Sequence, residues 1–128
     1  MSSNEIRKKI EELETGLKDF TSQVDTSILK YNDALNEIKN IELMIEKSND
    51  TLVIKSISNT NGKILNNTNK LIEKMETEKN NVITKINMKI NDLIEQEKLA
   101  LIEEAKIRDR QRKAKDANKN NNLSNNNR

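Results

Sequence analysis

The chain contains no cysteine, histidine, proline or tryptophan, and only two glycines, one phenylalanine and one tyrosine among its 128 residues. The absence of cysteine excludes disulfides and thiolate metal sites. Compact cores normally use aromatic side chains, and the turns around them use Gly and Pro. Because Pro costs a helix interior ~3 kcal/mol, a chain without it can form long uninterrupted helices. The composition therefore favours elongated helices over an ordinary globular domain.

The missing histidine and cysteine also argue against catalysis, because they are the usual neutral-pH base and the strongest side-chain nucleophile. The remaining candidates are carboxylates such as Glu103 and Glu104, which we expect on a solvated helix surface. No segment has the ligand spacing of a calcium-binding EF-hand, and neither glycine lies in a Gly-rich phosphate-binding loop. The sequence thus predicts no enzyme, no metal or cofactor site, and no small-molecule substrate.

Long hydrophobic runs are absent as well. The first residues, Met1 to Glu5, are polar and no apolar segment typical of a secretory signal follows them. No run approaches the roughly 20 apolar residues that span a membrane. We therefore expect an intracellular, soluble protein, in the cytoplasm or inside a virus particle.

The first half of the chain carries a regular hydrophobic seam. Between Ile6 and Leu52 the seam residues alternate at spacings of four and three, which is the 3.5-residue repeat of a coiled coil. Ser2 and Glu5 have capping-box spacing and predict the helix start, while Ile28 and Leu35 widen the seam and indicate more than one neighbouring helix. The side chains expected to contact another helix are Ile6, Ile10, Leu13, Leu17, Phe20, Val24, Tyr31, Ile38, Ile41 and Ile45.

The second half of the chain has a different period. Ile72, Ile83 and Ile94 are spaced by eleven residues, a repeat that produces a slight right-handed drift where seven produces a left-handed one. If the two halves pair, their joint supercoil should therefore be shallow. Lys79 and Glu97 interrupt this face and must either form ion pairs or extend to solvent. The side chains expected to contact another helix here are Ile72, Met75, Ile83, Ile86, Ile90 and Ile94.

Between the two halves the seam stops, and polar residues predict a chain reversal. The strongest signal is SNTNG at residues 58–62, which ends in an Asn-Gly pair that can adopt positive φ. We therefore expect an all-α protein in which a first coiled-coil helix, residues 1–57, and a second helix, residues 63–117, form an antiparallel hairpin. One continuous rod-like helix is the alternative, and a short β-element at residues 52–57 is a minor one.

The C-terminal segment is basic and rich in asparagine. Residues 106–128 contain eight basic and two acidic residues, and we expect residues 118–128 to be disordered because they have little apolar surface to bury. Such a segment can contact nucleic acid or an anionic membrane, although it lacks aromatic side chains for stacking on bases. A solvated charged end is the alternative. The residues expected to contact an acidic partner are Lys106, Arg108, Arg110, Arg112, Lys113 and Lys115.

In outline, two helical arms around a short connector resemble prefoldin subunits and the small helical subunits of vesicle-tethering complexes. Prefoldin subunits carry a β-hairpin between their arms, and residues 52–62 are too short for one, while stretches such as 34–38 and 64–67 are common to coiled coils in general. These resemblances identify no family. We expect a non-enzymatic coiled-coil scaffold or assembly subunit, for example of a vesicle-trafficking complex, that associates with itself or with other helical proteins. The alternative is a binding module whose basic tail contacts nucleic acid or an anionic membrane.

Overall fold

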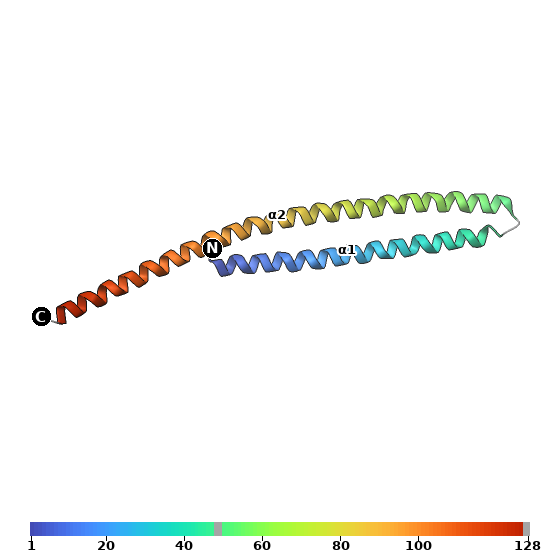
Figure 1. The fold of residues 1–128 in the computed structure, drawn as a ribbon. Coiled ribbons are helices and arrows are strands. Elements are labelled where there is room, and N and C mark those ends of the chain that lie inside the picture. The colour runs from blue at the N-terminus through green and yellow to red at the C-terminus, as the bar shows by residue number, and fades with distance from the viewer. Residues whose placement is uncertain (48–49, 127–128) are drawn as a thin grey trace. The chain divides into compact units, whose positions relative to one another are not determined.

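The computed structural model describes residues 1–47 and 50–126, which form two α-helices. Helix α1 spans Ser3–Ile45 and helix α2 spans Thr51–Asn126. The two helices pack against each other in an antiparallel hairpin (Figure 1), and the residues in these two described ranges include no strand. The predicted all-α hairpin is confirmed, and the single rod-like helix and the short β-element are wrong.

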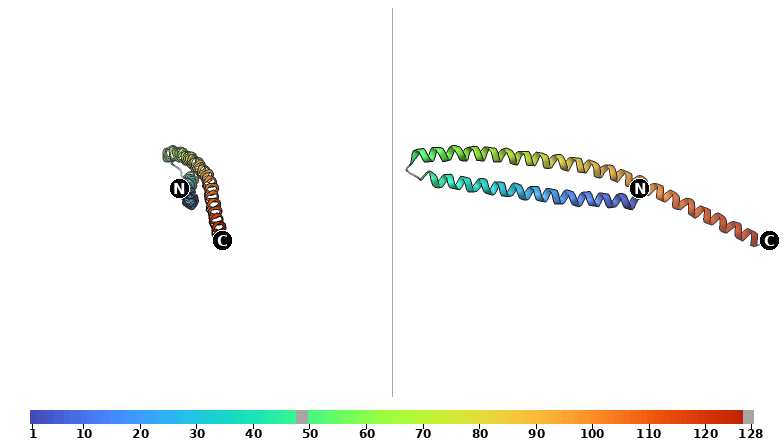
Figure 2. Two further views of the ribbon diagram at one scale, coloured as in Figure 1. Left: turned by 90° about the vertical axis from the view of Figure 1, so that its left-hand side faces the viewer. Right: turned by 180° about the vertical axis from the view of Figure 1, so that it is seen from behind.

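Each of two compact units contains part of both helices. The first unit combines Met1–Glu14 with Met88–Arg128, and the second comprises Thr15–Asn87. Within each unit, a segment of α1 lies beside a segment of α2 that runs in the opposite direction (Figure 2).

The chain reverses earlier than predicted. Since α1 ends at Ile45 and α2 begins at Thr51, the predicted turn at residues 58–62 is wrong. The predicted helix boundaries, 1–57 and 63–117, are wrong with it, because residues 58–62 lie inside α2.

A helix cap accounts for the position of the reversal. Asp50 Oδ1 accepts hydrogen bonds from the backbone N–H groups of Leu52 (3.1 Å) and Val53 (3.2 Å), so that Asp50 is the N-cap of α2. Gly62 has no positive φ, and the Asn-Gly pair is accommodated inside the helix. Gly in a helix interior costs only about 1 kcal/mol relative to Ala.

Helix α2 continues to Asn126, through residues for which the sequence predicts disorder. No glycine or proline follows Gly62, so that no residue in this part of the sequence breaks the helix. Residues 127 and 128 of the expected disordered tail lie outside the described residues, as do residues 48 and 49. An Asn-rich helix without a packing partner is marginal in water, and disorder of the isolated segment stays a prediction.

The hydrophobic core is a narrow line of side chains between the helices. Ile10 has no exposed surface, and Ile6 and Leu93 are 3% and 4% exposed. The hydrophobic side chains that count as buried among the described residues are Ile6, Ile10, Leu35, Ile72, Ile90 and Leu93. A core of this size gives the hairpin a definite interface but leaves much of each helix surface in solvent.

Candidate interaction surfaces

Fourteen of the sixteen side chains predicted to contact another helix are buried or half-buried. On α1 these are Ile6, Ile10, Leu13, Leu17, Phe20, Val24, Ile38 and Ile45, and on α2 they are Ile72, Met75, Ile83, Ile86, Ile90 and Ile94. Leu93, which is buried, was not among the predicted contact residues. It lies twenty-one residues, or three heptads, after Ile72, and this spacing is the signal that could have found it.

Tyr31 and Ile41 lie outside the interface between α1 and α2, with exposed fractions of 39% and 48%. Leu35, which the sequence places beside the seam, is buried instead, at 5%. Ile38 and Ile45, which belong to the same seam, remain half-buried, so that the exposure is local to Tyr31 and Ile41.

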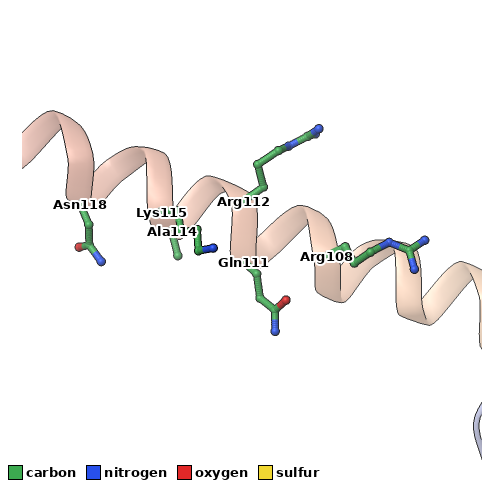
Figure 3. Close-up of a pocket in the computed structure, with 6 residues that line it drawn as sticks. All are labelled: Arg108, Gln111, Arg112, Ala114, Lys115 and Asn118. Atoms are coloured by element: carbon green, nitrogen blue, oxygen red, sulfur yellow. The ribbon is translucent and has the colours of Figure 1, made fainter.

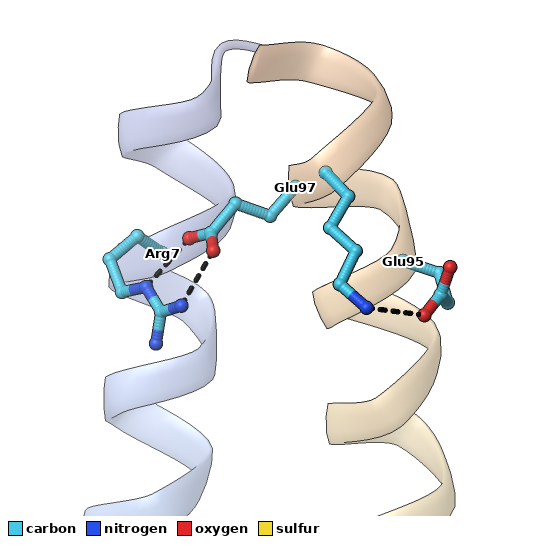
Figure 4. A network of polar contacts seen from close by, with 4 residues as sticks. Arg7, Glu95 and Glu97 are labelled. Atoms are coloured by element: carbon cyan, nitrogen blue, oxygen red, sulfur yellow. Dashed lines mark hydrogen bonds and ion pairs between the residues drawn. The ribbon is translucent and has the colours of Figure 1, made fainter. Parts of the chain in front are cut away.

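Lys79 and Glu97 interrupt the seam of α2, and each forms an ion pair with α1. Lys79 Nζ lies 2.6 Å from Asp25 Oδ1. Arg7 donates two hydrogen bonds to Glu97, from Nη2 to Oε1 at 2.5 Å and from Nε to Oε2 at 2.6 Å (Figure 4). Exposed pairs contribute only about 0–1 kcal/mol each, so that their main effect is to favour one register of the two helices.

A third polar contact holds the first turn of α1 against α2. The backbone N–H of Ser3 donates to Glu104 Oε1 at 3.0 Å, and the Ser3 hydroxyl donates to Glu104 Oε2 at 2.6 Å. A carboxylate at this position also interacts favourably with the dipole of α1. The predicted Ser2 cap is present, because Ser2 Oγ accepts a hydrogen bond from the Glu5 N–H at 3.2 Å.

Sequence reasoning assigned Glu104 to a solvated surface and missed its contact with Ser3. The signal that could have found the contact is the seven-residue spacing between Glu97 and Glu104, since residues one heptad apart lie on the same seam. Arg7 and Asp25, the partners of the interrupting residues Glu97 and Lys79, were missed as well. Many charged residues flank the seam of α1, and nothing local to either residue marks it as a partner.

These contacts lower the pKa of both interface carboxyls. For Glu97 the main cause is the hydrogen bond from the Arg7 side chain, and the pair also raises the pKa of Arg7. For Glu104 the main cause of the lowered pKa is the hydrogen bond from the Ser3 hydroxyl, followed by that from the Ser3 backbone. Carboxylates with lowered pKa values are weak proton acceptors at neutral pH, so that these groups suit structural contacts better than acid–base catalysis.

Beyond Glu104, the first unit contains α2 without a facing segment of α1, because Glu104 already contacts the first residue of α1. We call residues 105–126 the α2 extension. All six predicted tail residues lie on it and are exposed: Lys106, Arg108, Arg110, Arg112, Lys113 and Lys115. They gather on two helix faces with three residues each, because both sets have helical spacings of four and three.

One of the two basic faces is marked by a shallow hollow. Arg108, Arg112 and Lys115 line it together with neutral neighbours (Figure 3). Every lining residue comes from α2, so the hollow is an open helix surface and not an enclosed site. Asp109 lies beside this face and pairs with Arg112 at 2.5 Å, which leaves the extension basic but not uniformly so.

Within residues 1–47 and 50–126, no group of three or more acidic, His or Cys side chains is placed to hold a metal ion. No helix in this part of the chain is long and apolar enough to cross a membrane. No family model matches the chain, and no curated protein or solved structure matches it either. The function must therefore be argued from the surfaces described above.

Proposed function

We propose that the protein is a non-enzymatic assembly subunit, a helical hairpin that associates with further helices of its own kind or of other proteins. The observation that carries this proposal is the α2 extension, a helix that continues past the end of its partner. Around its start, Leu101, Ile102 and Ile107 are 48%, 52% and 42% exposed. Isolated helices are marginal in water, and most helical stability comes from packing an apolar face, so that a partner helix is the natural complement.

The polar contacts of the hairpin support the same proposal. Arg7 with Glu97, and Asp25 with Lys79, link the two helices without converging on a common cavity. Ion pairs beside a coiled-coil seam set the choice and orientation of partners. These two ion pairs are therefore contacts of the kind by which helices recognise one another.

Size-exclusion chromatography with light scattering, together with circular dichroism, tests this proposal. We expect a strongly helical species whose mass is at least twice the 14.8 kDa of one chain and does not change on dilution, because the exposed apolar side chains pack in the assembly. A helical monomer that also cross-links to no other protein in cells expressing it would contradict the proposal.

A second candidate function is binding of an acidic polymer or surface by the α2 extension. The observation that favours it is the line of exposed basic side chains Arg108, Arg112 and Lys115, spaced by four and three residues on one face. Three basic residues that contact three phosphates should make binding steeply salt-dependent, with an affinity loss of roughly 40-fold for an about fourfold rise in salt.

Fluorescence anisotropy with a labelled DNA duplex, and co-sedimentation with phosphatidylserine vesicles, measure this binding at two salt concentrations. We expect the variant R108Q/R112Q/K115Q to lose both the affinity and the salt dependence. The matched control is K8Q/K9Q/K18Q, which removes three exposed lysines outside the extension. Equal losses in the two variants would show that only net charge matters and would contradict a site on α2.

A further inference from the structure

The basic side chains of the α2 extension form two rows on nearly opposite sides of the helix. Successive residues of an α-helix are rotated by about 100°, so that residues spaced by four and three lie on one side. The first basic row consists of Arg108, Arg112, Lys115 and Lys119, and the second basic row of Lys106, Arg110 and Lys113. The two rows are about 160° apart around the helix axis.

A neutral row and two acidic residues separate the basic rows. The neutral row consists of Ile107, Gln111, Ala114 and Asn118, spaced by four, three and four residues. It lies about 100° from each basic row, and Figure 3 shows Gln111 and Asn118 pointing to the same side of α2. Asp109 and Asp116, the two acidic residues within 105–126, lie on the opposite side. The acidic side chains are thus turned away from the neutral row.

The three rows are open to a partner. Every side chain of the two basic rows and of the neutral row is exposed. Asp109 pairs with one residue of each basic row, with Arg112 at 2.5 Å and with Lys113 at 4.0 Å. Exposed ion pairs of this kind contribute little to stability, so that both cations can turn to another anion.

We propose that the α2 extension lies in the major groove of duplex DNA, with the neutral row against the base edges and one basic row on each phosphate backbone. This inference rests on the second proposed function, the binding of an acidic polymer or surface by the extension, and names the polymer. An α-helix is about 10–12 Å across, and the major groove is about 12 Å wide, so that it admits one helix. Phosphates then line both sides of the helix, where the two basic rows lie.

Other anionic partners fit this arrangement less well. A membrane meets one side of a helix, and helices that insert into its surface carry large apolar side chains there, whereas Ile107 and Ala114 are the apolar residues of the neutral row. Single strands stack on aromatic side chains, and the one Phe and one Tyr of the chain both lie on α1. The major groove of duplex RNA is too deep and narrow for side chains to read.

The neutral row also indicates which base pairs are preferred. Gln and Asn side chains form paired hydrogen bonds with N6 and N7 of adenine, and Ala contacts the methyl group of thymine. Gln111 and Asn118 are about 10 Å apart along the helix axis, which corresponds to about three base pairs at 3.4 Å each. Ala114 lies between them in the row. We therefore expect a preference for A·T-rich duplexes.

The salt dependence of binding tests whether both basic rows contact phosphates. Fluorescence anisotropy measures the affinity of the full chain for a labelled A·T-rich duplex between about 50 and about 200 mM salt. Seven contacts predict a slope of log affinity against log salt of about −6, and removal of either row of three by K106Q/R110Q/K113Q or R108Q/R112Q/K115Q should bring it to about −4. Contact through the first row alone would instead leave R108Q/R112Q/K115Q without salt dependence and K106Q/R110Q/K113Q like the wild type.

Controls separate contact from net charge and from folding. K8Q/K9Q/K18Q removes three exposed lysines of α1 and should keep the slope of the wild type. Gln, Lys and Arg have similar helix propensities, so that all three variants should keep the helical circular dichroism of the wild type.

A modified base tests contact with the major groove. Replacing adenine by 7-deazaadenine removes the N7 acceptor and leaves base pairing intact. We expect the modified duplex, and separately the variant Q111A/N118A, to lower the affinity at least about fivefold, and the two together to lower it no further, because both remove the same hydrogen bonds. The matched control is Q23A/N36A, which replaces one exposed Gln and one exposed Asn of α1 and should bind like the wild type.

Several results would overturn the groove, and they differ in what they leave standing. If one triple variant keeps the slope of the wild type, or if duplex RNA of the same sequence or phosphatidylserine vesicles bind as tightly as the DNA, the groove is wrong and binding of an acidic polymer or surface stands. If neither 7-deazaadenine nor Q111A/N118A lowers the affinity, the neutral row does not contact bases. If the wild type binds neither DNA nor vesicles at about 50 mM salt, the second proposed function fails together with the groove.

Discussion

Replacing Ile10 with alanine should lower the free energy of unfolding by about 2 to 4 kcal/mol, the range for removing a large aliphatic side chain from a packed core. Ile10 has no exposed surface, and its unit has only Ile6, Ile90 and Leu93 as further buried hydrophobic side chains among the described residues. With so few neighbours, the site cannot recover the lost contacts elsewhere. Urea denaturation followed by circular dichroism measures the change, with the unfolding midpoint and slope fitted together.

Leu43→Ala is the matched control for this experiment. Leu43 lies on the same helix and is 60% exposed, so that its replacement should change the free energy of unfolding by less than about 0.5 kcal/mol. Equal effects of the two substitutions would mean that the first turns of α1 are not packed on α2 in solution. A reduced slope in the Ile10 variant would instead show that this end of the hairpin opens before the rest.

The position of the loop illustrates what local sequence signals leave out. The Asn-Gly pair at residues 61 and 62 is a strong local turn signal, but the pairing of the whole helices decides the register. A turn centred on residue 60 would place Lys79 near Ile41 and Glu97 near Gln23, away from Asp25 and Arg7. The observed loop lets Lys79 reach Asp25 and Glu97 reach Arg7.

The hydrophobic seam of α1, unlike the loop position, can be recognised from local sequence spacing. Eight of the ten seam positions predicted on α1 are buried or half-buried, and apolar spacing is a local property of the chain that can be read without the fold. Ile38 and Ile45 keep the seam half-buried up to the end of α1, whereas Tyr31 and Ile41 are exposed. The heptad spacing alone does not distinguish these two residues from their neighbours.

The capping of α1 could be predicted only in part. Ser2 and Glu5 mark the helix start through their spacing, and the structure has the hydrogen bond from the Glu5 N–H to Ser2 Oγ. The second cap, in which Glu104 accepts both hydrogen bonds from Ser3, joins residues 101 positions apart. Its existence depends on the register, which local patterns do not determine.

Replacing both glycines with alanine should raise the free energy of unfolding by about 2 kcal/mol, about 1 kcal/mol for each site. Gly16 and Gly62 lie inside helices, neither has a positive φ, and a Cβ added at either position meets no atom within 4 Å. Alanine therefore brings its higher helix propensity without a steric penalty, and it also restricts the unfolded chain. Urea denaturation of the two single variants and the double variant measures the gain.

The sign of the Gly62 effect decides where the chain reverses. A hairpin turn at residues 58–62 needs positive φ at glycine, so that Gly62→Ala would then destabilise the protein, whereas a helix through this position makes the same substitution stabilising. Gly16→Ala is the matched control, because Gly16 lies within the first helix whether the chain reverses at residues 46–50 or at 58–62. Stabilisation by Gly16→Ala alone, with destabilisation by Gly62→Ala, would contradict a helix that begins at Thr51. Equal stabilisation by both would place the loop before Thr51 and support the register in which Lys79 pairs with Asp25.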